Sequence, residues 1–161
     1  GGLGMARQTY YIRFGGFDNH GELLNNHADR LSMLSAAIGS FYEAMEELGV
    51  SDNVTTFSIS DFARTLTANG FGTDHAWGGH SMVFGGAVNG GQIFGQYPSL
   101  ALDNELDVGN GVLIPELCTD QYFAELALWL GVDSSELFDI FPNLENFYTA
   151  GTGNPIGFLN L

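Results

Sequence analysis

The side chains with chemistry to offer gather in three short segments. Residues 15–20 read GGFDNH, residues 60–65 read SDFART and residues 72–80 read GTDHAWGGH. Carboxylates and neutral imidazoles without thiolates form a mixed oxygen and nitrogen ligand set, which suits zinc, manganese or iron. Histidine is also a natural general acid or base near neutral pH. The segments predict either a metal centre or glycine-rich turns whose histidines only pack.

Six residues in these segments are candidates for a functional site. The predicted ligands of a divalent metal are Asp18, His20, Asp61, His75 and His80, and the predicted anion or substrate contact is Arg64. Each has a simpler alternative. An aspartate after a strand often caps a turn, a guanidinium in an acidic chain often pairs with a carboxylate, and histidines often pack against an aromatic ring such as Trp77. For His27 the structural role is favoured.

The predicted secondary structure brings these segments to one place. TYYIRF, at residues 9–14, predicts a buried strand, and VTTFSIS, at 54–60, predicts a second. Between them, apolar residues recur with helical period over residues 26–48, and Gly49 can supply a left-handed C-terminal cap. A strand–helix–strand unit predicts parallel strands, so Asp18 and Asp61 are expected beyond the same edge of an α/β sheet.

The remainder of the chain predicts short strands and two helices. Residues 69–95 are rich in glycine, and HSMVF and GQIF within them predict short strands or a hairpin. The first helix is expected at 120–130 with Thr119 as its cap, and the second at 134–140 with an Asp133–Glu136 capping box. Cys118 is expected as a small core residue. Without a repeat or a linker, residues 1–161 are predicted to form one domain.

Charge and composition exclude several classes of function. The formal net charge is −15, with four arginines and no lysine, so nucleic acid and anionic membranes are poor partners. The same charge disfavours phosphate and sulfate esters unless bound cations reverse the field locally. No apolar run reaches the ~20 residues of a membrane helix. No nucleotide-binding fingerprint, phosphate-loop lysine or G-x-S-x-G elbow occurs.

Taken together, the three segments, FGGAVNGGQIFGQYP at residues 84–98 and IFPN at 140–143 resemble the C-terminal half of the family called domain of unknown function 1501. The resemblance covers nearly the whole chain. It implies a partial alkaline-phosphatase-like parallel sheet with flanking helices and a glycine-rich hairpin region. It also implies membership of the alkaline phosphatase and sulfatase superfamily, whose members act on phosphate or sulfate esters at one or two metals. Members of the domain of unknown function 1501 family are often exported, commonly with a twin-arginine type leader.

The resemblance also assigns roles to individual residues. Asp18 and His20 match a first pair of metal ligands, Asp61 matches the strand-end aspartate of a second metal, and His75 or His80 matches the remaining imidazole. The superfamily usually has a histidine after that aspartate, where this chain has Phe62. Its nucleophile and another metal-binding aspartate lie in an N-terminal half that is absent from this sequence, so a partner chain is one expected source of that half.

Two functions from different classes follow. The first is a metal-dependent, exported phosphatase-like or sulfatase-like hydrolase domain. The second is a secreted structural protein that keeps the fold without the chemistry and assembles with copies of itself, because removing half of a sheet exposes surfaces that normally pack. A calcium-binding or glycan-binding module, suggested by ALDNELD and Trp77, is the least favoured.

Overall fold

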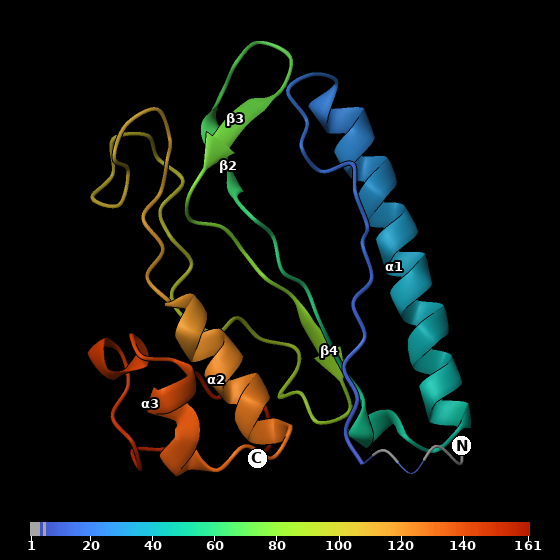
Figure 1. Ribbon diagram of the computed structural model, residues 1–161. Helices are drawn as coiled ribbons and strands as arrows, with labels where there is room; N and C mark the ends of the chain where they lie inside the picture. Colours follow the sequence, from blue (N-terminus) through green and yellow to red (C-terminus); the bar gives the residue numbers. More distant parts are fainter. Residues whose placement is uncertain (1–3, 5) are drawn as a thin grey trace.

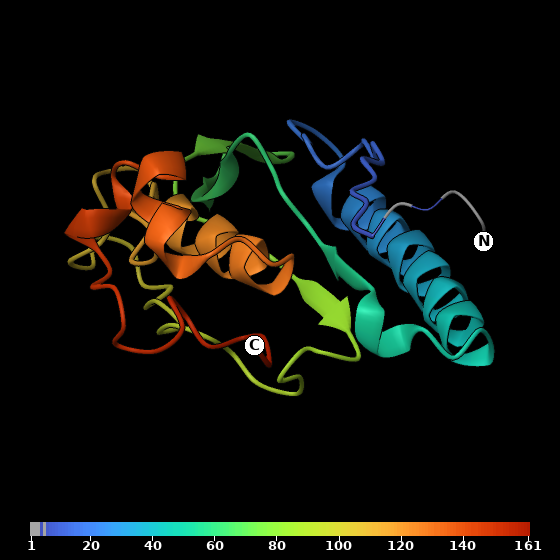
Figure 2. The same cartoon turned by 60° about the horizontal axis from the view of Figure 1, so that its bottom comes forward.

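The protein is a mixture of helices and short antiparallel strand pairs (Figures 1 and 2). The computed structural model describes residue 4 and residues 6–161. Its elements are α1 (Leu23–Glu47), η1 (Ser51–Asn53), β1 (Thr55–Phe57), β2 (Ala63–Ala68), β3 (Thr73–Ala76), β4 (Val83–Gly85), α2 (Thr119–Trp129), η2 (Ser134–Glu136), α3 (Leu137–Ile140) and η3 (Leu144–Asn146). The prediction of a chain that mixes helix and strand is confirmed. None of the described helices has the length and apolar character needed to span a membrane.

Helix α1 confirms the strongest periodic signal in the sequence. It begins at Leu23, three residues before the predicted start, and ends at Glu47. The predicted role of Gly49 is also confirmed, because this residue has φ +68° and its N–H donates to the Glu46 carbonyl oxygen at 2.9 Å. No residue of α1 is buried. The apolar side of the helix therefore has only partial cover.

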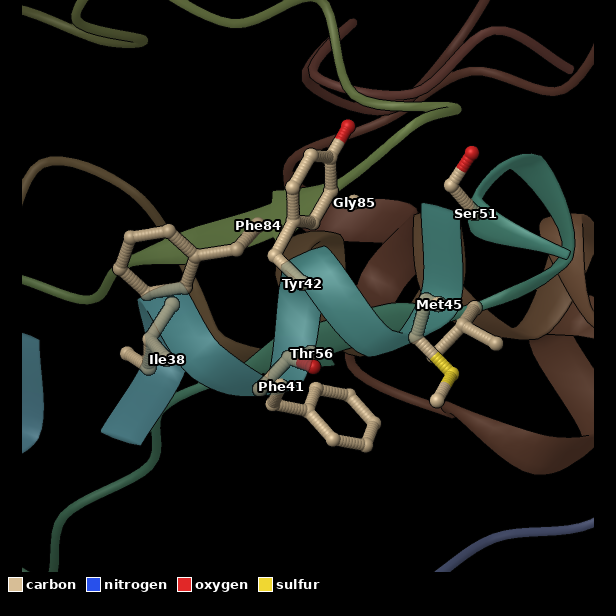
Figure 3. A pocket seen from close by; sticks show the side chains of 9 residues that line it. Ile38, Phe41, Tyr42, Met45, Ser51, Thr56, Phe84 and Gly85 are labelled. Atoms are coloured by element: carbon tan, nitrogen blue, oxygen red, sulfur yellow. The ribbon is translucent and has the colours of Figure 1, made fainter. Parts of the chain in front are cut away.

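That partial cover comes from the strand pair β1–β4. Figure 3 shows Ile38, Tyr42 and Met45 of α1 lining a shallow pocket whose opposite wall includes Thr56 and Phe84. β1 and β4 are antiparallel, with Thr56 opposite Phe84. The strand predicted at 54–60 is thus confirmed over Thr55–Phe57, and HSMVF contributes β4, whereas GQIF forms no strand.

The predicted strand at residues 9–14 is wrong. The segment lies beside α1 without regular strand structure (Figure 1), and Tyr10, Tyr11 and Ile12 are 78%, 78% and 85% exposed. Strand propensity reflects packing against neighbours rather than an intrinsic preference of the backbone, and here no neighbouring strand pairs with the segment. The expected parallel pairing with residues 54–60 is absent from the part of the chain that the structure describes.

A β2–β3 hairpin follows Asp61, and strand β3 (Thr73–Ala76) lies within the segment GTDHAWGGH. Arg64 on β2 stands opposite His75 on β3, and the register shifts between Arg64 and Ala68. The turn is held by Asn69, whose side-chain oxygen accepts hydrogen bonds from the backbone N–H groups of Phe71 and Gly72 at 3.3 and 2.9 Å. Asparagine makes such local side-chain contacts readily in turns. The turn returns the chain antiparallel to β2, so His75 lies on strand β3.

The apolar core lies at the other end of the molecule, around α2, α3 and the C-terminal segment. Ala124, Leu137 and Leu144 form one buried cluster, and Leu126, Phe158 and Leu159 form a second. The first helix predicted in this region is confirmed as α2. Its N-cap, however, is Cys118 rather than Thr119, and the Cys118 sulfur accepts a hydrogen bond from the Asp120 N–H at 3.3 Å.

The second predicted helix is divided into η2 and α3. The Asp133 cap is confirmed, because its carboxylate accepts the Ser135 N–H at 2.8 Å. The fully buried side chain of Glu125 on α2 holds residues 156–159 against the helix. It accepts hydrogen bonds from the N–H groups of Ile156, Gly157 and Leu159 at 2.7, 2.6 and 2.7 Å. Polar burial of this kind is tolerated because every contact is charge-assisted.

Candidate metal centre

The loop before α1 is fixed against the β2–β3 hairpin (Figure 1). The side chain of Asn19 is buried and donates to the Gly16 carbonyl oxygen at 3.2 Å, and the Asn19 carbonyl oxygen accepts the Thr73 N–H at 3.2 Å. At Gly72 the hairpin approaches so closely that an added Cβ would lie 2.4 Å from the Asn19 oxygen and 2.6 Å from the His20 carbonyl carbon. This contact requires glycine. Docking of the loop brings Asp18 and His20 to the hairpin.

Three of the predicted ligands then meet. His20 Nε2 lies 3.0 Å from Asp18 Oδ1 and 3.0 Å from His75 Nε2, and His75 Nε2 lies 3.1 Å from Asp18 Oδ1. All three side chains are about half exposed, so solvent and ions reach them. Asp18, His20 and His75 are hereafter called the ligand triangle.

The ligand triangle concentrates lone pairs. A carboxylate only accepts hydrogen bonds, and a neutral imidazole carries one N–H and one lone pair. With the two Nε2 atoms 3.0 Å apart, only one hydrogen fits between them. Three atoms at this separation therefore need a shared hydrogen or a cation to offset the repulsion of their lone pairs.

Arg64 supplies part of that positive charge. Its side chain is 20% exposed; one terminal nitrogen, Nη1, donates to Asp18 Oδ1, while the other, Nη2, donates to the Thr73 carbonyl oxygen. Its Nε donates to Thr73 Oγ1 at 3.0 Å. The guanidinium is thus held by β3 and pairs with a carboxylate, which is the simpler of the two roles expected from the sequence.

The charges around the ligand triangle favour ionised carboxylates. Partial desolvation acts to raise the pKa of Asp18, but hydrogen bonds from His75 and Arg64 and the charges of both histidines outweigh it and lower that pKa below its usual value. The pKa of Asp74 is lowered chiefly by the hydrogen bond from Asn69, with a further contribution from His20. Both groups therefore stay in the form that binds cations well below neutral pH.

Phe62 contacts the ligand triangle directly. Its ring stacks on His75 with centroids 3.9 Å apart and an interplanar angle of 20°. Across an antiparallel pair, a residue two positions before the directly opposed one lies diagonally on the same face. Since Arg64 opposes His75, Phe62 is that diagonal neighbour. Phe62 thus packs against one of the imidazoles of the ligand triangle.

Asp61 and His80 lie outside the ligand triangle. Among the described residues, the group of side chains close enough to share an ion consists of Asp18, His20 and His75. Asp61 is exposed just before β2. His80 stacks on Tyr97 with ring centroids 5.0 Å apart, and His27 packs edge-on against Phe17 with centroids 5.9 Å apart.

Two neighbours of the ligand triangle were missed by the sequence analysis. Asp74 contacts His20 Nδ1 at 3.2 Å, and Phe62 stacks on His75. Both residues could have been found by recognising the β-hairpin in the sequence. The alternation in ARTLTA followed by Asn69-Gly70 is a typical hairpin sequence, and its register places Phe62 beside His75.

Comparison with protein families gives one match. The family model described as "Protein of unknown function (DUF1501)" matches residues 7–147. No curated protein matches the chain. No solved structure matches it either.

Proposed function

We propose that the chain, which belongs to the DUF1501 family of proteins of unknown function, is a metal-binding domain that hydrolyses a phosphate or sulfate ester. The observation that carries this proposal is the ligand triangle, in which three ligand atoms from two segments 55 to 57 residues apart lie within 3.1 Å of one another. Exposed acidic groups are common on protein surfaces. Two imidazoles converging on one carboxylate oxygen are a more specific arrangement.

The separations within the ligand triangle suit a divalent transition metal. Bonds of about 2.1 Å are typical for imidazole and carboxylate ligands of zinc; at that bond length neighbouring ligands stand about 3.0 Å apart at the right angles of an octahedral site and about 3.4 Å apart at the tetrahedral angle that zinc usually adopts. The observed separations are 3.0, 3.0 and 3.1 Å. Two imidazoles and one carboxylate suit zinc, manganese or iron better than calcium, which prefers oxygen ligands. Asp18, His20 and His75 are the residues that would hold the metal.

A bound divalent metal polarises an ester oxygen and lowers the pKa of a coordinated water toward about 7. Among the described residues no serine or threonine hydroxyl forms a hydrogen bond with Asp18, His20 or His75, so we assign the nucleophile to a group outside these residues, either water or a side chain of the segment that completes the fold. Arg64 uses three of its five N–H groups on Asp18 and Thr73. The remaining two are available to an anionic ester, which offsets locally the repulsion expected from a net charge of −15.

The same proposal includes the finer features implied by the family resemblance. We propose that the chain is the C-terminal part of an alkaline-phosphatase-like fold, that it is exported, and that a further segment or partner chain supplies the strands with which it forms a parallel sheet. The extended, exposed segment at residues 9–14 supports this view, because its backbone is free to pair with an added strand. Asp61 and His80 would serve a second metal in the completed site.

Metal titration followed by an ester assay tests the proposal. Zinc, manganese and iron(II) are titrated into chelator-treated protein by calorimetry, and each loaded form is assayed with p-nitrophenyl phosphate and p-nitrophenyl sulfate. We expect one equivalent to bind, and Asp18→Ala to abolish binding. Asp61→Ala and His80→Ala are the matched controls and should leave this first equivalent unchanged. Binding that survives Asp18→Ala would refute the ligand triangle as the metal site.

A second function, self-assembly, is favoured by the exposed apolar surface. Leu24 and Met33 of α1 are 84% and 54% exposed, and Tyr11 and Ile12 of the N-terminal segment are 78% and 85% exposed. Large apolar side chains exposed on both α1 and the N-terminal segment favour burial against another molecule. Light scattering over a range of protein and salt concentrations tests it, because salt screens the acidic repulsion between copies. A monomer at every condition would exclude self-assembly.

A further inference from the structure

We propose that Asp74 is a positioning residue that fixes the tautomer of His20 and so presents the His20 Nε2 lone pair to the ligand triangle. The effect of Asp74 on metal affinity rests on the proposed metal function. The contact between Asp74 and His20, and the tautomer that it fixes, exist in the protein without metal. His20 Nδ1 lies 3.2 Å from Asp74 Oδ1, while His20 Nε2 lies 3.0 Å from Asp18 Oδ1.

The two ring nitrogens of His20 face different surroundings. Nδ1 contacts the single carboxylate of Asp74, which only accepts hydrogen bonds. Nε2 faces both Asp18 and His75, and a hydrogen on His75 Nε2 can be shared between Asp18 Oδ1 and His20 Nε2. With its own hydrogen on Nδ1 and donated to Asp74, neutral His20 has a hydrogen-bond partner at each nitrogen, whereas with the hydrogen on Nε2 the Nδ1 lone pair would face the Asp74 carboxylate. The Nε2 lone pair is then directed into the ligand triangle.

Asp74 is itself held in place by the hairpin turn. Asn69 Nδ2 donates to Asp74 Oδ1 at 3.0 Å, and the Asp74 N–H donates to Thr65 Oγ1 at 3.1 Å. Asn69 is in turn fixed by two backbone N–H groups of the turn. The same carboxylate oxygen thus receives Asn69 and faces His20, so the turn between β2 and β3 determines how the imidazole is oriented.

This arrangement has a defined role in a metal centre. A histidine that ligates a metal through one nitrogen commonly donates its other N–H to a carboxylate, which fixes the tautomer and makes the ligand more basic. Losing such a partner typically weakens metal binding about 10- to 100-fold. Asp74 would act in this way through His20, without touching the metal.

The tautomer can be measured directly in metal-free protein. Long-range ¹H–¹⁵N correlation spectra at about pH 8.5, where a typical imidazole is neutral, report which nitrogen of His20 carries the hydrogen, with the His20 signals assigned from a His20→Gln variant. We expect Nδ1–H in the wild type and a shift toward Nε2–H in Asp74→Ala. Asp139→Ala removes an exposed carboxylate outside the site and should change nothing. His20 with Nε2–H in the wild type would overturn the proposal, whether or not the variants fold.

Metal affinity supplies the second readout. In a competition titration with a chromophoric zinc chelator, Asp74→Ala should bind zinc about 10- to 100-fold more weakly, and Asp74→Asn, which keeps an acceptor oxygen, should lose less. Unchanged affinity in a folded Asp74→Ala variant would refute the positioning role. If the wild type binds none of zinc, manganese and iron(II), the proposed metal function fails, while the tautomer still decides the assignment of Asp74.

Discussion

Substituting Gly72 with alanine should open the ligand triangle. An added Cβ would lie 2.4 Å from the Asn19 carbonyl oxygen and 2.6 Å from the His20 carbonyl carbon. Relieving the first contact to an ordinary van der Waals separation of 3.4–4 Å requires the loop to move by about 1.0–1.6 Å. His20 belongs to that loop, whereas His75 belongs to the hairpin. The movement therefore changes the distance between two ligands that a metal site needs to hold within about 0.5 Å.

Gly72→Ala should accordingly weaken zinc binding about 10- to 100-fold, comparable to the loss of an outer partner, and destabilise the fold by about 1–3 kcal/mol through overpacking. Chelator competition measures the affinity, and urea unfolding measures the stability. Gly21→Ala is the matched control, since Gly21 adjoins His20 and a Cβ there meets nothing within 4 Å. Affinity within twofold of the wild type for Gly72→Ala would show that docking of the loop does not set the ligand geometry.

Three further predictions concern the core, the acid stability and the aromatic contact. Glu125→Gln should lower the free energy of unfolding by about 2–4 kcal/mol, because a buried carboxylate that accepts three backbone N–H groups becomes a neutral amide; urea unfolding checks this. The pKa of Asp107 is lowered by backbone hydrogen bonds, first from Asp103, so its stabilisation is present above about pH 3.9 and is lost as pH falls through the lower folded-state pKa. Asp107→Asn should flatten the decline of stability below about pH 3.9, measured by urea unfolding as a function of pH. Phe62→Leu should weaken zinc binding about 2- to 13-fold, the equivalent of about 0.5–1.5 kcal/mol for the stacked ring, and an unchanged affinity would assign the stacking on His75 to packing alone.

Sequence reasoning succeeded where a local signal was complete. The period of apolar residues and the glycine after it located α1 within three residues at its start and one at its end. Helical hydrogen bonds lie within one segment, so the sequence of that segment is sufficient. The capping of η2 by Asp133 is equally local, because donor and acceptor are two residues apart.

Whether a segment forms a strand depends on which other segment pairs with it, and the sequence of the segment does not identify that pairing strand. Residues 9–14 have high strand propensity but no neighbouring strand, and they remain extended and exposed. Conversely, short strands or a hairpin were predicted within the glycine-rich residues 69–95, whereas the β2–β3 hairpin begins at Ala63 and turns at residues 69–72. Glycine there permits a turn with positive φ and does not loosen the segment.

The candidate site was predictable in residue type and only partly in geometry. The convergence of Asp18, His20 and His75 was predicted, but for the wrong reason, since these residues meet at an antiparallel hairpin and not beyond parallel strands. Contacts among side chains depend on strand register, and the register places Phe62 next to His75. The wider set with Asp61 and His80 remains a prediction for a second metal.

Metal content tests the central claim most directly. Elemental mass spectrometry of protein purified without chelator is compared with the Asp18→Ala/His75→Ala double variant, with Asp61→Ala as a control of equal charge change to Asp18→Ala. We predict close to one equivalent of zinc, manganese or iron in the wild type and in the control, and background levels in the double variant. Wild-type protein that holds no metal, and takes up none when it is supplied, would contradict the claim that the ligand triangle is a metal centre.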